Sequence, residues 1–231
     1  MSITSILFDF DFTLADSSDA VFECANYALK KMGLPTRSYP EVCKTIGMSL
    51  TDGFLYLTKE SDDNSVVVFR RLFIEKADEV MVDKTVIFEG VEEMLSDLKA
   101  QHLKLGIVST KFRYRILDIL NRNGISHRFD IIVGGEDVEN HKPDPEGLLK
   151  ALAELSASKS ECLYAGDSRA DGEAARRCGV RFAAVGSGVT SLRELREYDP
   201  VLTCASVTQL PELISSFHPE MALFHNFCVD L

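Results

Sequence analysis

The segment ITSILFDFDFTLAD, residues 3–16, decides the fold because a short apolar run leads directly into acidic residues. The run from Ile3 to Phe8 predicts a buried strand, and Asp9 and Asp11 follow at its C-terminal end. Open α/β sheets place their chemistry at this edge. Residues i and i+2 of an extended segment point the same way, so both carboxylates can address one reacting centre. Solvated turns contain the same pair by chance, and the rest of the chain decides between the two interpretations.

Length and composition indicate a globular chain with one or two packed cores. The chain has 231 residues, of which 45% are apolar and 26% are charged. This length accommodates one α/β domain that carries an insertion. No apolar run approaches the ~20 residues that a membrane span needs, and the start of the chain lacks a signal-peptide pattern. We therefore expect a cytoplasmic protein without a membrane partner, as a monomer or homodimer.

The charge balance disfavours a nucleic acid partner. The formal net charge is −11, whereas nucleic acid binding depends on a basic surface. The six cysteines are scattered, without a CxxC pair or a histidine at metal-ligand spacing. We expect reduced, mostly buried thiols.

Hydrophobic periodicity divides the chain into two parts. Helical spacing recurs through residues 17–83, and strand and helix patterns alternate from about Thr85 onward. Strict alternation predicts parallel strands with right-handed crossovers. The predicted fold class is therefore α/β, a doubly wound, Rossmann-like parallel sheet with an inserted all-helical cap. The core comprises residues 1–16 and 84–231 and the cap residues 17–83, while the tail 217–231 stays unassigned.

Three later segments place polar groups at strand ends or in a rigid loop. Ser109 and Thr110 follow an apolar strand, Lys142 lies in a loop with two prolines, and Asp167 and Asp171 follow another strand. A hydroxyl can donate to a phosphate oxygen, and a fixed lysine can stand as a point charge beside an anion. Carboxylates bind hard divalent cations. Taken singly, each residue is more often an ordinary turn or surface residue.

The order of these motifs resembles the haloacid dehalogenase superfamily, and in particular its phosphoglycolate phosphatase-like group with an α-helical (type C1) cap. The four motifs of that family correspond here to Asp9–Thr13, Ser109, Lys142 and Gly166–Asp171. The resemblance covers the chain to about residue 215. It includes the helical insertion between the first and second motifs.

This resemblance implies a phosphatase that acts on a small phosphorylated metabolite. Asp9 is expected to be the nucleophile that forms an aspartyl-phosphate. Asp11 is expected to protonate the leaving group and then activate water. Ser109, Thr110 and Lys142 would hold the phosphoryl oxygens.

The resemblance also implies Mg²⁺ as the cofactor. Asp9, the backbone carbonyl of Asp11 and Asp167 would hold the ion, with Asp171 in support, either through water or by orienting a ligand. Four carboxylates against one Mg²⁺ and Lys142 would leave a net charge of about −1 before the substrate arrives. Losing either cation should then abolish activity.

The sequence defines the leaving group less closely than the chemistry. The first cap loop, residues 45–51, lacks the arginine that β-phosphoglucomutases carry there, which favours a phosphatase over a phosphotransferase. Gly47 and Ser49, with Lys44, are candidates for leaving-group recognition, or the loop is a plain interhelical turn. Phosphorylated acids, pyrophosphate, sugar phosphates and nucleotides all stay open. The alternative of another class is a catalytically silent binding module.

One residue departs from the family pattern. The family usually has glycine directly after the second aspartate, where this chain has Phe12. The ring should fit if the backbone stays in an ordinary extended or helical region, and it should narrow the entrance or touch the cap. Phe12→Gly should then change substrate preference more than turnover on a small generic ester.

Overall fold

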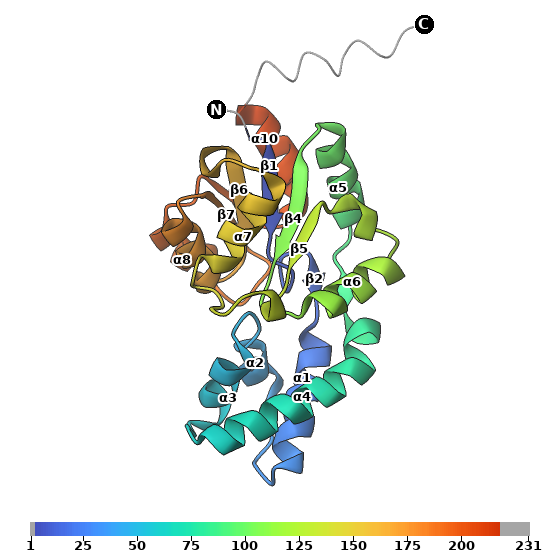
Figure 1. Ribbon diagram of the computed structural model, residues 1–231, viewed down its shortest axis with the longest axis vertical. Helices are drawn as coiled ribbons and strands as arrows, with labels where there is room; N and C mark the ends of the chain where they lie inside the picture. Colours follow the sequence, from blue (N-terminus) through green and yellow to red (C-terminus); the bar gives the residue numbers. More distant parts are fainter. Residues whose placement is uncertain (1–2, 218–231) are drawn as a thin grey trace, which may run out of the picture.

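The computed structural model describes residues 3–217 and contains a parallel sheet between helices, with a separate group of helices at the carboxyl edge of the sheet (Figure 1). The strand order is β5-β4-β1-β6-β7-β8, and all neighbours run parallel. The strands are β1 (Ser5–Phe8), β4 (Lys104–Val108), β5 (Ile131–Val133), β6 (Cys162–Gly166), β7 (Arg181–Val185) and β8 (Leu202–Cys204). The predicted doubly wound α/β fold class is confirmed.

Strand β1 is the centre of the sheet because both of its faces are covered. Ile6 and Phe8 point into one apolar core and Leu7 into the other. The first face is covered by α5 (Val91–Ala100), α6 (Arg113–Arg122) and α10 (Leu210–Phe217), and the second by α7 (Glu146–Leu155), α8 (Arg169–Cys178) and α9 (Leu192–Leu195). A slip of one residue would exchange the two faces. Burial therefore fixes the register that delivers Asp9 to the carboxyl edge.

The helical group has an apolar core of its own. It consists of α1 (Ser18–Lys31), α2 (Tyr39–Cys43), α3 (Leu50–Thr58) and α4 (Asp63–Lys84), and Phe54, Phe69 and Phe73 are buried within it. Helices α1 and α4 lie side by side, below the sheet in Figure 1. The group corresponds to the expected cap. The proposed boundaries, with the core at 1–16 and 84–231 and the cap at 17–83, stay a prediction.

The sequence pattern did not predict the shortest elements of the fold. The two links between sheet and helical group pair as antiparallel β2 (Ala15–Asp16) and β3 (Val86–Ile87), and β8 has only three residues. Elements this short contain too few residues to display a period. Five 3₁₀ turns complete the described chain: Ser126–Arg128, Gly135–Asp137, Lys159–Glu161, Arg196–Tyr198 and Val207–Gln209.

The remaining expectations concern the membrane, the cysteines and the tail. Within residues 3–217, no helix combines the length and the apolar character that a membrane crossing requires. The five cysteines of this region are free and buried. The unassigned tail, from residue 218 onward, lies outside the described residues.

Candidate active site

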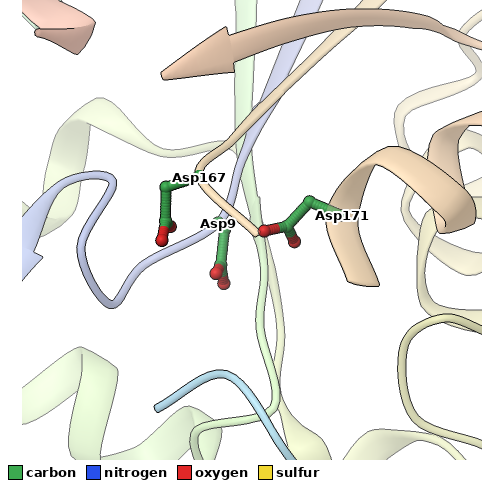
Figure 2. Close-up of side chains that lie close together, drawn as sticks. All are labelled: Asp9, Asp167 and Asp171. Carbon is green, nitrogen blue, oxygen red and sulfur yellow. The ribbon is translucent and has the colours of Figure 1, made fainter. Parts of the chain in front are cut away.

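Three carboxylates meet at the carboxyl edge of the sheet (Figure 2). Asp9 follows β1, Asp167 follows the neighbouring strand β6, and Asp171 lies in the first turn of α8. One oxygen from each lies within 4.8 Å of the others. The residues are only 2%, 4% and 0% exposed. Adjacent parallel strands end at one edge, and this is why segments 158 positions apart in the chain converge.

Lys142 joins this cluster as its basic member. Its Nζ lies 2.8 Å from Asp9 Oδ1 and 2.6 Å from Asp171 Oδ1. It also lies 3.1 Å from the hydroxyl of Tyr164, which in turn donates to Asp171 Oδ1 at 2.8 Å. Sequence analysis missed Tyr164 because a tyrosine within an apolar strand predicts a core residue. The structure shows that it positions Lys142 and Asp171 together.

Burial sets the electrostatics of the cluster. Burial raises the pKa of Asp9 to about 7, against the opposing charge of Lys142 and with the like charge of Asp171 adding to it. Burial and the like charges of Asp171 and Asp9 raise the pKa of Asp167 well above its usual range. Burial would also raise the pKa of Asp171, but the ion pair with Lys142 and its hydrogen bonds lower it below the ordinary value. The cluster therefore carries more negative charge than it can stabilise by itself.

The donor set fits a hard divalent cation. Three buried carboxylates face one lysine, and carboxylate oxygens are the ligands that Mg²⁺ prefers. Asp171 Oδ1 accepts from Lys142 and Tyr164, and its Oδ2 accepts from the backbone and hydroxyl of Ser168. Because both oxygens are engaged, Asp171 is better placed to orient Lys142 than to bind an ion directly. Asp9 and Asp167 are the better candidate ligands.

Asp11 lies beside this cluster with partners that the sequence did not reveal. Its Oδ1 accepts a 2.5 Å hydrogen bond from the Ser17 hydroxyl and lies 3.2 Å from Lys111 Nζ. Lys111 lies two residues after Ser109, as Asp11 lies two residues after Asp9. This equal spacing after two neighbouring strands could have indicated that Lys111 and Asp11 lie close together. The expected net charge of about −1 did not count Lys111. With this second lysine, a bound divalent cation would bring the sum for the four carboxylates to about zero.

The predicted phosphate-binding hydroxyls lie on β4, next to β1. Ser109 is 6% exposed and follows this strand two residues past Ile107, the pairing partner of Phe8. Thr110 points instead toward the helical group, where its hydroxyl donates to the Gly47 carbonyl at 3.3 Å. Ser109 is therefore beside the carboxylates, and Thr110 connects the two parts of the molecule.

The predicted cap residues line a cavity of about 80 Å³ between the helical group and the sheet edge. Gly47 and Ser49 both line it, together with Asp11. The Ser49 hydroxyl is engaged locally, since it accepts from the Asp52 backbone and donates to the Asp52 carboxylate at the start of α3. Lys44 is exposed and is not among the residues that line the cavity. The loop thus borders the cavity. However, the Ser49 hydroxyl is already hydrogen-bonded to Asp52, and Lys44 lies outside the lining.

Phe12 differs from the expectation. Its φ is +59°, in the left-handed region that favours glycine, so the condition of an ordinary extended or helical backbone is not met. The turn that leads into β2 requires this conformation: the Phe12 N–H donates to the Ala15 carbonyl at 2.7 Å, and its own carbonyl accepts from Ser187. Phe12 does not line the cavity described above. The family pattern has glycine at this position, and glycine adopts a positive φ without strain.

A doubly wound sheet with an inserted helical group and this order of Asp, Ser, Lys and Asp at one edge defines a haloacid dehalogenase-like hydrolase. The model of the haloacid dehalogenase-like hydrolase family matches residues 6–185. The chain belongs to this family, and it is a phosphatase within it.

Individual relatives match nearly the whole chain. Pyrophosphatase PpaX of Halalkalibacterium halodurans is 32% identical over 215 residues, which cover 93% of this chain and 98% of the relative. PpaX of Bacillus velezensis is 32% identical over 198 residues, covering 86% and 90%. A solved haloacid dehalogenase-like hydrolase from Bacteroides fragilis has a TM-score of 0.88 and 40% identity, covering 90% of this chain and all of its own.

Proposed function

We propose that this chain is a Mg²⁺-dependent phosphatase that hydrolyses a small phosphomonoester through an aspartyl-phosphate on Asp9. The observation that most supports this is the buried contact of 2.8 Å between Asp9 and Lys142, with Asp167 alongside. A carboxylate in such a position can attack phosphorus only if the charge of the phosphate is neutralised. Bound at Asp9 and Asp167, Mg²⁺ would supply that neutralisation.

In the first step an oxygen of Asp9 attacks phosphorus, and the bond from phosphorus to the leaving oxygen breaks. Lys142 and Ser109 hold the phosphoryl oxygens while their charge redistributes. Asp11 gives its proton to the leaving oxygen. The leaving group departs as an alcohol and Asp9 carries the phosphoryl group.

In the second step water attacks the aspartyl-phosphate, and Asp11 takes the proton from that water. The contacts from Ser17 and Lys111 both fall on Asp11 Oδ1. This arrangement leaves Oδ2 as the oxygen for proton transfer. Inorganic phosphate is released and Asp9 is regenerated.

A pyrophosphatase is the second candidate function. The observation that favours it is the identity of 32% to relatives named pyrophosphatase over almost their full length. In this reaction the leaving group is a second phosphate, and Asp9 and Asp11 play the same parts. A β-phosphoglucomutase-like phosphotransferase is less favoured because the cap loop 45–51 lacks an arginine. A silent binding module would need none of the observed order of charged residues.

The proposal is tested by phosphate release from a panel of esters with and without Mg²⁺. The panel holds phosphorylated acids, pyrophosphate, sugar phosphates and nucleotides, ranked by kcat/KM. Asp9→Asn should abolish release, and Asp11→Asn should lower it by ~10²–10⁴-fold. Asp97→Asn, an exposed carboxylate on α5, is the matched control and should change nothing.

Rapid quenching with labelled substrate provides a second measurement. Labelled protein should form in the wild type and accumulate in Asp11→Asn, but not in Asp9→Asn. Hydrolysis that persists in Asp9→Asn would contradict the mechanism. A phosphotransferase would require a bisphosphate and release little phosphate, and a silent module would hydrolyse none of the panel.

A further inference from the structure

The cavity of about 80 Å³ lies where the leaving group would have to be. Asp11, the proposed proton donor, forms part of its lining, so the cavity adjoins the bond that breaks. The helical group contributes mostly apolar walls, among them Ile46, Leu50 and Phe73. The sheet side contributes the charged groups. The cavity is therefore apolar on one side and polar on the other.

Lys111 is a buried cation with unused donors in this lining. It is 9% exposed. Its Nζ lies 3.2 Å from Asp11 Oδ1, and its hydrogen bond goes to the thioether of Met81 at 3.2 Å. A thioether is a weak acceptor, and an ammonium group has three donors. The charge of Lys111 is paired with Asp11, but one of its donors reaches only the weak thioether and another has no partner among the described residues, and leaving buried donors unpaired is costly. A second anion would relieve that cost.

The other polar side chains of the lining have partners nearby, although no hydrogen bond from Arg115 Nη1 is found among the described residues. Arg115 donates to Asp78 Oδ1 through two nitrogens, at 2.6 and 3.0 Å, and to the Ile74 carbonyl at 3.1 Å. The Thr45 hydroxyl donates to the Val42 carbonyl at 2.7 Å. As described above, the hydroxyls of Ser49 and Thr110 also have partners. Arg115 is paired with Asp78 of α4, whereas Lys111 adjoins Asp11 and so lies next to the bond that breaks. Lys111 is therefore the cation of this lining that is best placed to contact the leaving group.

We propose that Lys111 binds an anionic group carried by the leaving group, and that this makes the enzyme selective for small acidic phosphate esters or anhydrides. The inference rests on the proposed phosphatase function. A carboxylate and a second phosphate share the required chemistry. The cavity of about 80 Å³ is smaller than the ~150 Å³ that holds benzene, which favours a leaving group of a few heavy atoms.

The test uses esters with a two-carbon leaving group that differ in charge. They are 2-phosphoglycolate with a carboxylate, 2-hydroxyethyl phosphate with a hydroxyl and phosphoethanolamine with an ammonium group. Pyrophosphate tests the phosphate as the anion. For wild type we expect kcat/KM to be about ten- to a hundredfold higher for 2-phosphoglycolate than for 2-hydroxyethyl phosphate, and lowest for phosphoethanolamine.

Two variants assign this preference to Lys111. Lys111→Met removes the charge, keeps an unbranched side chain only one atom shorter, and should remove most of the preference for the acid. Lys111→Arg should retain most of it. Lys150→Met is the matched control, because this lysine is exposed on α7 and donates to the Asp137 carbonyl at 2.8 Å, away from the cavity. It should leave the ratio between the substrates unchanged.

Distinct outcomes overturn the inference and the underlying function. If Lys111→Met lowers kcat/KM for all esters by one factor, Lys111 acts only on Asp11 and the inference fails. It also fails, without any variant, if the wild type prefers the neutral or cationic ester. The proposed function fails instead if the wild type shows no Asp9-dependent hydrolysis of any substrate. Where both are hydrolysed, the ratio of kcat/KM for 2-phosphoglycolate to kcat/KM for pyrophosphate identifies the preferred anion.

Discussion

Asp167→Asn tests the metal site without altering the proposed nucleophile. The substitution removes one negative charge from the cluster and keeps the shape of the side chain. The amide oxygen can still accept the hydrogen bond that Asp167 Oδ1 receives from the Thr13 hydroxyl at 2.9 Å. We therefore expect the variant to fold. It should be more stable than the wild type without metal and should lose the response to metal.

The separation of the carboxylates sets the size of the effect. Their oxygens lie within 4.8 Å of one another. Two like charges at that distance repel by about 3.5 kcal/mol at an effective dielectric constant of ~20. Lys142 offsets part of this, so we expect Asp167→Asn to gain about 1–3 kcal/mol in free energy of unfolding without metal at pH 8. For a chain of this size, 1 kcal/mol shifts Tm by roughly 2–4 °C.

The same effect should depend on pH. Burial and the like charges of Asp171 and Asp9 raise the pKa of Asp167 in the folded state. A carboxyl group whose folded pKa is raised binds its proton more tightly when folded, so the group favours folding at low pH. Stability is lost as pH rises from the unfolded value through the folded pKa. The advantage of Asp167→Asn should therefore be small near pH 4 and grow toward pH 8.

The assay is thermal unfolding in EDTA and in MgCl₂ at pH 5 and pH 8. At a Mg²⁺ concentration a hundred times Kd, the wild type should gain about 2.7 kcal/mol, and Asp167→Asn should gain much less. Asp97→Asn should behave as the wild type. The reasoning is refuted if Asp167→Asn is less stable than the wild type in EDTA at pH 8, or if Mg²⁺ stabilises both equally.

Three further predictions concern residues around the site. Tyr164→Phe removes the hydroxyl that donates to Asp171 at 2.8 Å, and we expect kcat/KM to fall about tenfold, with no fall counting against its positioning role. Phe12→Gly should be more stable than Phe12→Ala by about 1 kcal/mol, because alanine strains at φ +59°. Equal stability in chemical denaturation would exclude the left-handed backbone, and the expected change in substrate preference is measured on the same panel. Asp78→Asn removes the counter-charge of the buried Arg115 at the joint between α4 and α6, so KM should rise several-fold while kcat changes little. An unchanged KM would show that this contact does not hold the two parts together.

The convergence of the carboxylates and Lys142 in the candidate site could be predicted from the sequence because each part has a local signal. An apolar run followed by a carboxylate defines Asp9 after β1 and Asp167 after β6, and parallel strands necessarily end at one edge. Lys142 was found because two prolines mark its loop. These signals lie within short segments of the chain, so they can be read without knowing which segments contact one another in the fold.

The roles of Lys111, Ser17 and Tyr164 could not be predicted in this way. Lys111 and Tyr164 depend on contacts between distant segments: Lys111 lies beside Asp11 because β4 pairs with β1, and Tyr164 on β6 contacts Lys142 of the loop before α7. Ser17 is only six residues from Asp11, and its hydroxyl reaches the carboxylate after the turn at residues 12–15. Sequence spacing alone does not specify which of several nearby lysines becomes buried. This is why the sequence offered Lys44, with Gly47 and Ser49, as candidates for leaving-group recognition, whereas our proposal from the structure names Lys111.

The sequence by itself determined the α/β class, the helical insertion and the order of the carboxylates and Lys142, since periodicity and strand ends are local properties. Only the tertiary structure decided the backbone of Phe12, the partners of Asp11 and the cavity at the joint of the two parts. The physical reason is that burial and the pairing of charges arise between segments distant in the chain. One example is the hydrogen bond from Ser187 to the Phe12 carbonyl.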